Sequence, residues 1–109
     1  MKYEYSEAAL NSLMNFSERE AEKIQDLINE AAVEEFYNYN SYSYIYDDHR
    51  NLWDKLDLKQ ENLNHRVFFT KINSVVFILD VFDRDNIEYG KDLYSKLSEL
   101  DDEIRNNRS

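Results

Sequence analysis

The chain has 109 residues, of which 42% are hydrophobic and 15% aromatic, so we expect one folded domain (residues 1–109) with a hydrophobic core. It contains no cysteine, which excludes disulfides, thiolate metal sites and cysteine nucleophiles. Its net charge of −10 argues against direct DNA binding, because nucleic-acid binding depends on neutralising phosphates with Lys and Arg.

The first third of the chain predicts a short strand followed by two helices. MKYEYS (1–6) alternates as a strand does, and its last residue, Ser6, suits the cap of a first helix. Ser17 and Glu20 have the spacing of a capping box, which marks the start of a second helix. Apolar residues then recur at helical spacing, at Ala21, Ile24, Leu27, Ile28, Ala31 and Ala32.

A row of carboxylates accompanies the second helix in i, i+4 steps. Its members are Glu18, Glu22, Asp26, Glu30 and Glu34. One interpretation is a binding surface that imitates a row of phosphates or docks a basic partner. The alternative is a solvated helix face, in which Arg19 and Lys23 pair with Glu22 and Asp26.

Residues 37–50, YNYNSYSYIYDDHR, are unusually rich in tyrosine. The alternation predicts two short extended pieces with a slip of one residue at Ser41. A platform for stacking bases would need Arg or Lys between the aromatics, whereas Asn and Ser stand there. We therefore predict that Tyr42, Tyr44 and Tyr46 contact a protein partner. The spacing of the acidic and histidine residues that follow does not match a metal site, so we predict none.

The second half predicts a group of antiparallel strands and a last helix. Strands are expected at 52–58, 65–72 and 75–82, with a tight connection at Asn73-Ser74. The last of these strands is almost wholly apolar, as expected for a central strand covered on both faces. The final helix has apolar residues at Leu93, Leu97, Leu100 and Ile104.

Two segments resemble the RelE/ParE toxin superfamily: NHRVFFTKINSVVFILDVFDRDN (64–86), with its two strands, and YSEAALNSLMNFSEREAEKIQDLIN (5–29), with its helical hairpin. The resemblance implies an α+β fold, in which an N-terminal helical hairpin packs on a small antiparallel sheet of three to four strands beside a C-terminal helix. It also implies a toxin that cleaves ribosome-bound mRNA or inhibits DNA gyrase. The partner would be a cognate antitoxin or another protein.

The resemblance also points to candidate catalytic residues. Arg66 and Arg84 match family arginines by position, Tyr89 matches a C-terminal tyrosine, and His65 is a candidate by residue type. Arginines would stabilise a pentavalent phosphorane, while His65, His49 or Tyr89 would transfer protons. Because His65 and Arg66 are neighbours on a strand, however, we expect them to point to opposite faces.

Each arginine also has a structural interpretation as part of an ion pair. The candidate partners are Asp80 and Glu61 for Arg66, and Asp83 and Asp85 for Arg84. The two aspartates beside Arg84 would also repel a phosphate.

A second hypothesis is therefore a noncatalytic acidic protein on the same fold, which occupies a basic protein surface as a degenerate toxin or a nucleic-acid mimic. The single glycine leaves no phosphate-binding loop, and we predict no cofactor. No leader and no apolar run of the ~18 residues that span a membrane are present, so we expect a cytoplasmic protein without membrane contact.

Overall fold

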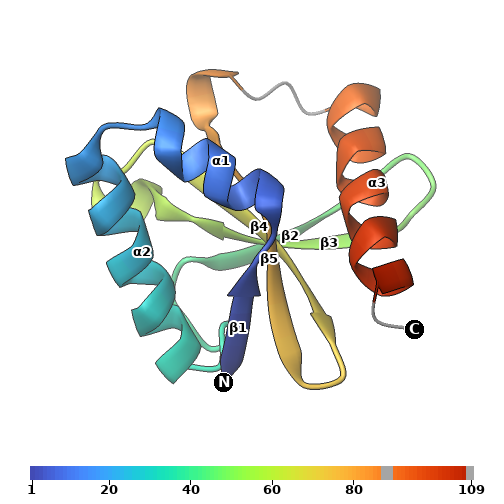
Figure 1. Cartoon of the computed structure of the whole chain (residues 1–109), viewed down its shortest axis with the longest axis horizontal. Helices are drawn as coiled ribbons and strands as arrows, with labels where there is room; N and C mark the ends of the chain where they lie inside the picture. Colours follow the sequence, from blue (N-terminus) through green and yellow to red (C-terminus); the bar gives the residue numbers. More distant parts are fainter. Residues whose placement is uncertain (87–89, 108–109) are drawn as a thin grey trace.

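The computed structural model describes residues 1–86 and 90–107 and confirms the α+β class, with helices on both faces of one sheet (Figure 1). The elements in chain order are β1 (Lys2–Tyr5), α1 (Glu7–Asn15), α2 (Glu18–Val33), β2 (Tyr42–Tyr46), β3 (Leu52–Asp57), the 3-10 turn η1 (Leu58–Glu61), β4 (His65–Ile72), β5 (Val75–Asp83), the 3-10 turn η2 (Arg84–Asn86) and α3 (Lys91–Asn107). None of the helices in these described segments is both long and apolar enough to cross a membrane.

The sheet has five strands in the order β1-β5-β4-β3-β2, and it is mixed. Strands β2 to β5 form an antiparallel meander, whereas β1 pairs in parallel with β5. The expectation of a purely antiparallel sheet of three to four strands is therefore wrong. The prediction did not include β1 as a fifth strand that pairs in parallel. The end of β1 is held by distant contacts, such as the hydrogen bond that Ser6 Oγ donates to the Leu79 carbonyl, 73 residues away. Local sequence patterns carry no signal for such a distant pairing.

The helical hairpin forms where its caps predict. Ser6 Oγ accepts a hydrogen bond from the Ala9 amide at 3.0 Å and starts α1. The capping box of Ser17 and Glu20 is present in both directions and starts α2, as predicted. Only Phe16 and Ser17 separate the helices, so α1 and α2 lie beside each other over one face of the sheet (Figure 1).

Two clusters of buried side chains fill the two sides of the sheet. The larger cluster lies under α1 and α2 and includes Ile24, Ile28 and Phe69. The smaller one lies under α3 and includes Phe68 and Leu97. The inner strand β5 contributes to both clusters, as its apolar sequence predicts.

The end of α2 differs from the prediction of a strand beginning at residue 37. Glu35 and Phe36 have positive φ angles of 58° and 61°, and the Phe36 amide donates to the Ala31 carbonyl at 2.7 Å. This turn buries the Phe36 ring completely. The backbone strain is offset by that burial, and regular strand structure begins only at Tyr42.

The β4–β5 hairpin turns at Asn73 and Ser74, both with positive φ, which confirms the tight connection predicted there. A bulge interrupts the hairpin, because Phe68 pairs with Asp80 while Phe69 pairs with Ile78. Asp80 is 1% exposed there.

The Asp80 carboxylate accepts from Ser12 Oγ of α1 at 2.5 Å and lies 3.2 Å from Lys96 Nζ of α3. It therefore links both helix layers to the sheet.

Candidate functional site

Arg66, a predicted catalytic residue, is a buried strand residue with an internal partner. Its side chain is 7% exposed, and its Nη1 lies 2.8 Å from Asp57 Oδ1. Asp57 stands directly opposite Arg66 on β3, which explains why this carboxylate, rather than Asp80 or Glu61, neutralises the guanidinium. The ion-pair interpretation was therefore right in kind and wrong in its partner.

A second buried cation lies beside Arg66 and was missed in the sequence. Lys55 is 8% exposed and donates from Nζ to Ser43 Oγ at 2.9 Å. Burial lowers its pKa; the Asp57 charge opposes this shift, and the Arg66 charge adds to it. The sequence feature that could have revealed Lys55 is its i, i+2 spacing with Asp57. Residues at this spacing lie on the same face of a strand, and Arg66 lies on that face of the sheet too.

His65 lies on the opposite face of the sheet from Arg66, as the neighbouring positions predict. Its ring is 2% exposed and packs edge-on against Phe16, with centroids 4.7 Å apart. Its Nε2 lies 3.7 Å from Glu20 Oε2. His65 thus supports the corner between α1 and α2, and the structure does not bring it to the Arg66 side chain.

The other predicted catalytic residues follow β5 in the sequence. Arg84 is exposed in η2, and its backbone N–H donates to the Asn64 carbonyl at 2.7 Å. Within the described segments its side chain forms no ion pair with Asp83 or Asp85, so this expected pairing is absent. Tyr89 lies outside the described residues.

The tyrosine segment is divided between internal hydrogen bonds and an exposed edge. Tyr42 donates to Asp54 Oδ1 at 2.6 Å, and Tyr37 donates to the other oxygen of that carboxylate at 3.2 Å. Burial, reinforced by Asp54, raises the pKa of Tyr37 to about 12 and also raises the pKa of Tyr42. Tyr42 therefore contributes to the fold, and its contact with a partner remains a prediction.

Tyr44 and Tyr46 have the exposure that a partner contact requires. They are 55% and 59% exposed on the edge strand β2, and their rings lie edge to face with centroids 5.7 Å apart. Their contact with a partner remains a prediction.

Asp47 organises the turn that follows β2. Its carboxylate accepts from the amides of His49 and Asn51 at 2.8 and 2.9 Å and from Trp53 Nε1 at 3.1 Å. Burial alone would raise the pKa of Asp47, but these hydrogen bonds outweigh it and hold the pKa below its usual value. The described part of the chain contains no group of three or more acidic or histidine side chains arranged to hold a metal ion.

The predicted row of carboxylates on α2 divides into two groups. Each i, i+4 step advances about 40° around a helix axis, so five members spread over roughly 160°. Glu18, Glu22 and Asp26 face the side where α1 lies. Farther along α2, Glu30 accepts a hydrogen bond from Tyr39 at 3.0 Å, and Glu34 forms the C-cap of the helix. The row is therefore not one continuous surface.

The first three carboxylates border a groove between α1 and α2, which we call the acidic groove. Its volume is about 1030 Å³. The lining residues are Leu10, Leu13, Met14, Phe16, Glu18, Ala21, Glu22, Gln25, Asp26 and Asn29. Leu10 is 48% exposed and Met14 is 81% exposed, so the groove presents apolar surface to solvent beside its carboxylates.

The charge of the acidic groove is not neutralised by its own helix. Within residues 1–86 and 90–107, its three carboxylates have neither an ion pair nor a side-chain hydrogen bond. Arg19 and Lys23 belong to the same helix but do not line the groove. The expected pairs of Arg19 with Glu22 and Lys23 with Asp26 are absent from the described structure. The groove therefore retains a concentrated negative charge.

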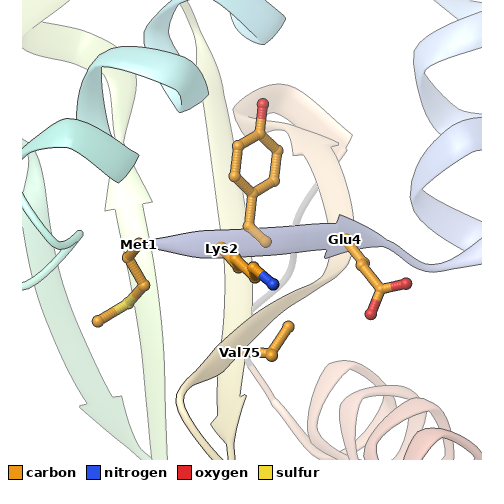
Figure 2. Close-up of a pocket in the computed structure, with 5 residues that line it drawn as sticks. Met1, Lys2, Glu4 and Val75 are labelled. Carbon is orange, nitrogen blue, oxygen red and sulfur yellow. The ribbon is translucent and has the colours of Figure 1, made fainter.

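A separate hollow beside the edge strand β1 does not combine apolar surface with like charges as the acidic groove does. It measures about 500 Å³ and is lined by Met1, Lys2, Tyr3, Glu4 and Val75. Figure 2 shows Lys2 and Glu4 projecting to the same side of β1, above Val75 of the neighbouring strand. Because Lys2 and Glu4 carry opposite charges, the hollow favours neither an anion nor a cation.

Comparison of the chain with protein-family models, curated proteins and solved structures finds no match. The resemblance to RelE/ParE toxins therefore stays a prediction.

Proposed function

We propose that this protein is a noncatalytic acidic binding protein, and that it occupies a positively charged protein surface with the acidic groove. The observation that carries this proposal is the combination of exposed apolar side chains with three carboxylates that have no internal partner in the described structure. Like charges on one helix repel one another by a few tenths of a kcal/mol per pair, and no contact of these carboxylates within the described structure offsets that repulsion. A basic partner would remove that repulsion on binding.

The arrangement of the predicted catalytic residues also supports binding over catalysis. Arg66 is buried and neutralised by Asp57, while His65 lies under the opposite helix layer. A general base must reach the proton that it removes, and a cation must reach the phosphate that it stabilises. His65 and Arg66 cannot serve the same phosphate from opposite faces of a sheet.

The proposal is tested with fluorescently labelled poly-L-lysine as the basic probe. Affinity is measured at low and high ionic strength for the wild type and for Glu22→Gln/Asp26→Asn. We expect a steep loss of affinity with salt, and a roughly fivefold loss at low salt in the double variant.

The matched control is Glu34→Gln/Glu103→Gln, which removes two exposed carboxylates that do not line the groove. Its affinity should change by less than about twofold, a difference of roughly 0.4 kcal/mol. An equal loss in both double variants would show that net charge alone attracts the probe, and would contradict a role for the groove.

A second candidate function, an RNA-cleaving toxin, is favoured by one observation. Lys55 and Arg66 form a buried pair of cations with one carboxylate between them, and Arg84 stands exposed at the end of the neighbouring strand β5. Such cations could stabilise a phosphorane if the ion pair with Asp57 opened. In this case the partner would be ribosome-bound mRNA, with an antitoxin to restrain the activity.

The two candidates differ in a growth experiment. The protein is expressed from an inducible promoter in a bacterial host, wild type beside Arg84→Ala, and growth and mRNA 5′ ends are followed. The binding function predicts normal growth and no new 5′ ends with abundant folded protein. Growth arrest with new ends that Arg84→Ala abolishes would establish the toxin. Arg84 is the cleaner variant because Arg66 also contributes an ion pair to the fold.

A further inference from the structure

The acidic groove has a shape and chemistry that suit one class of occupant. Resting on the proposed function, we infer that the groove binds an amphipathic α-helix whose apolar stripe is flanked by Lys and Arg. The helix would lie along α1 and α2, with its apolar stripe on Leu10 and Met14 and its cations toward Glu18, Glu22 and Asp26.

The apolar part of the groove matches a helix stripe. Leu10 and Met14 are one i, i+4 step apart on α1, so their side chains lie about 6 Å apart on one face. Leu13 and Phe16, largely buried behind them, continue the apolar lining toward the corner of the hairpin. A bound amphipathic helix presents apolar residues at i, i+3 and i+4, and their spacing matches that of Leu10 and Met14.

The charged part of the groove matches the flank of the same helix. Glu18, Glu22 and Asp26 rise about 6 Å per step over about 12 Å of α2. Lys or Arg residues three or four positions apart on a helix beside α2 have this repeat. Gln25 and Asn29 add neutral hydrogen-bonding groups along the same wall. The spacing of the apolar residues and the spacing of the carboxylates in the groove thus both match an α-helical partner.

Charge decides against the other occupants of such a groove. A nucleic acid would bring phosphates to three carboxylates, and a second copy of this chain would bring a further net charge of −10. A basic segment without helical structure would satisfy the carboxylates but would leave Leu10 and Met14 unmatched, because its apolar residues do not form a stripe.

The experiment uses two synthetic peptides of about 14 residues, or four helical turns, and identical Leu and Lys composition. In one peptide Leu residues form an i, i+3, i+4, i+7 stripe, and in the other the order is scrambled. We expect the amphipathic peptide to bind the wild type about tenfold more tightly, measured by calorimetry. In Leu10→Gln/Met14→Gln this preference should fall below about twofold, since the apolar contact is lost.

The control is Val33→Gln/Leu52→Gln, because Val33 and Leu52 are 80% and 48% exposed, almost the same as Met14 and Leu10, and lie outside the groove. This control should keep the full preference. Equal binding of both peptides, weakened by Glu22→Gln/Asp26→Asn, would overturn the helix as occupant while the proposed function stands. Absence of binding by either peptide at low salt would overturn both.

Discussion

The carboxylates of the acidic groove and those around the sheet are used in opposite ways. Around the sheet, Asp57 pairs with Arg66, and Asp54 accepts from two tyrosines. In the groove, Glu22 and Asp26 have no such partner in the described structure, although Arg19 and Lys23 stand on the same helix. The acidic residues of this chain thus include one group that stabilises the fold and another group that has no internal partner in the described structure.

The difference follows from where each side chain lies. A carboxylate at the sheet loses much of its hydration and requires a donor or a cation. A carboxylate on the solvent side of α2 remains hydrated, so repulsion between neighbours costs only a few tenths of a kcal/mol per pair. The fold can therefore retain an unpaired row at small cost, and substitutions at the two places should have different effects.

The largest effect is expected at the buried ion pair. Asp57→Asn keeps a side-chain oxygen for the Lys59 amide but removes the charge opposite Arg66. Because a buried guanidinium without a counter-charge is costly, the free energy of unfolding in urea should fall by about 2 kcal/mol, a value reduced by the partial exposure of Asp57. Replacing both partners, Arg66→Met/Asp57→Leu, should restore most of the loss. A fall below about 0.5 kcal/mol in Asp57→Asn would show that the pair is not needed.

An intermediate effect is expected at Asp54, and it should depend on pH. The pKa of Tyr37 is raised to about 12 and that of Tyr42 is also raised, so their stabilising contribution is complete below pH 10 and is lost as pH rises through the folded-state values. Asp54→Asn should weaken this contribution and lower the free energy of unfolding by roughly 1 kcal/mol near pH 8, after allowance for solvent screening. The difference from the wild type should begin to shrink as pH rises through about 12, because Tyr37 then ionises and can no longer donate to Asp54.

Urea unfolding at a series of pH values measures this difference, and absorbance at alkaline pH follows the phenolates. A difference in the free energy of unfolding that stays constant across the alkaline range would show that Asp54 does not act through its hydrogen bonds with the tyrosines.

The smallest effect on stability is expected in the acidic groove. Glu22→Gln/Asp26→Asn removes three pairs of like charges at i, i+4 spacing, each worth about 0.2 kcal/mol when exposed and screened by salt, so the free energy of unfolding should rise by roughly 0.6 kcal/mol. The same variant should show the largest loss of binding to a basic probe. A loss of stability above about 1 kcal/mol would mean that these carboxylates stabilise the fold and would remove the contrast with the sheet.

Local features of the fold were predictable from the sequence, and distant pairings were not. The capping box at Ser17 and the turn at Asn73-Ser74 depend on a few neighbouring residues, so their patterns suffice. The parallel pairing of β1 with β5 and the choice of Asp57 as partner of Arg66 depend on strand order and register. These arise from the packing of the whole chain.

The candidate site was predictable in part. The carboxylates were visible as an i, i+4 row, but its division required the position of α1, which covers one flank of α2. The exposure of Met14 could not be predicted from the sequence either, because its helical spacing with Leu10 and Leu13 also fits a core residue. Tyr42 and Tyr44 alternate identically in sequence, yet Tyr42 packs against the core and donates to Asp54, whereas Tyr44 is 55% exposed.

The most direct test of the groove as the binding surface uses the two methionines as paired NMR probes. Met14 lies in the acidic groove, and Met1 lies at the start of β1 beside a different hollow. With ¹³C-methyl-labelled methionine, addition of the amphipathic basic peptide should shift the Met14 methyl resonance and leave that of Met1 in place. Binding that leaves the Met14 resonance unchanged, or that shifts only the Met1 resonance, would show that the acidic groove is not the binding surface.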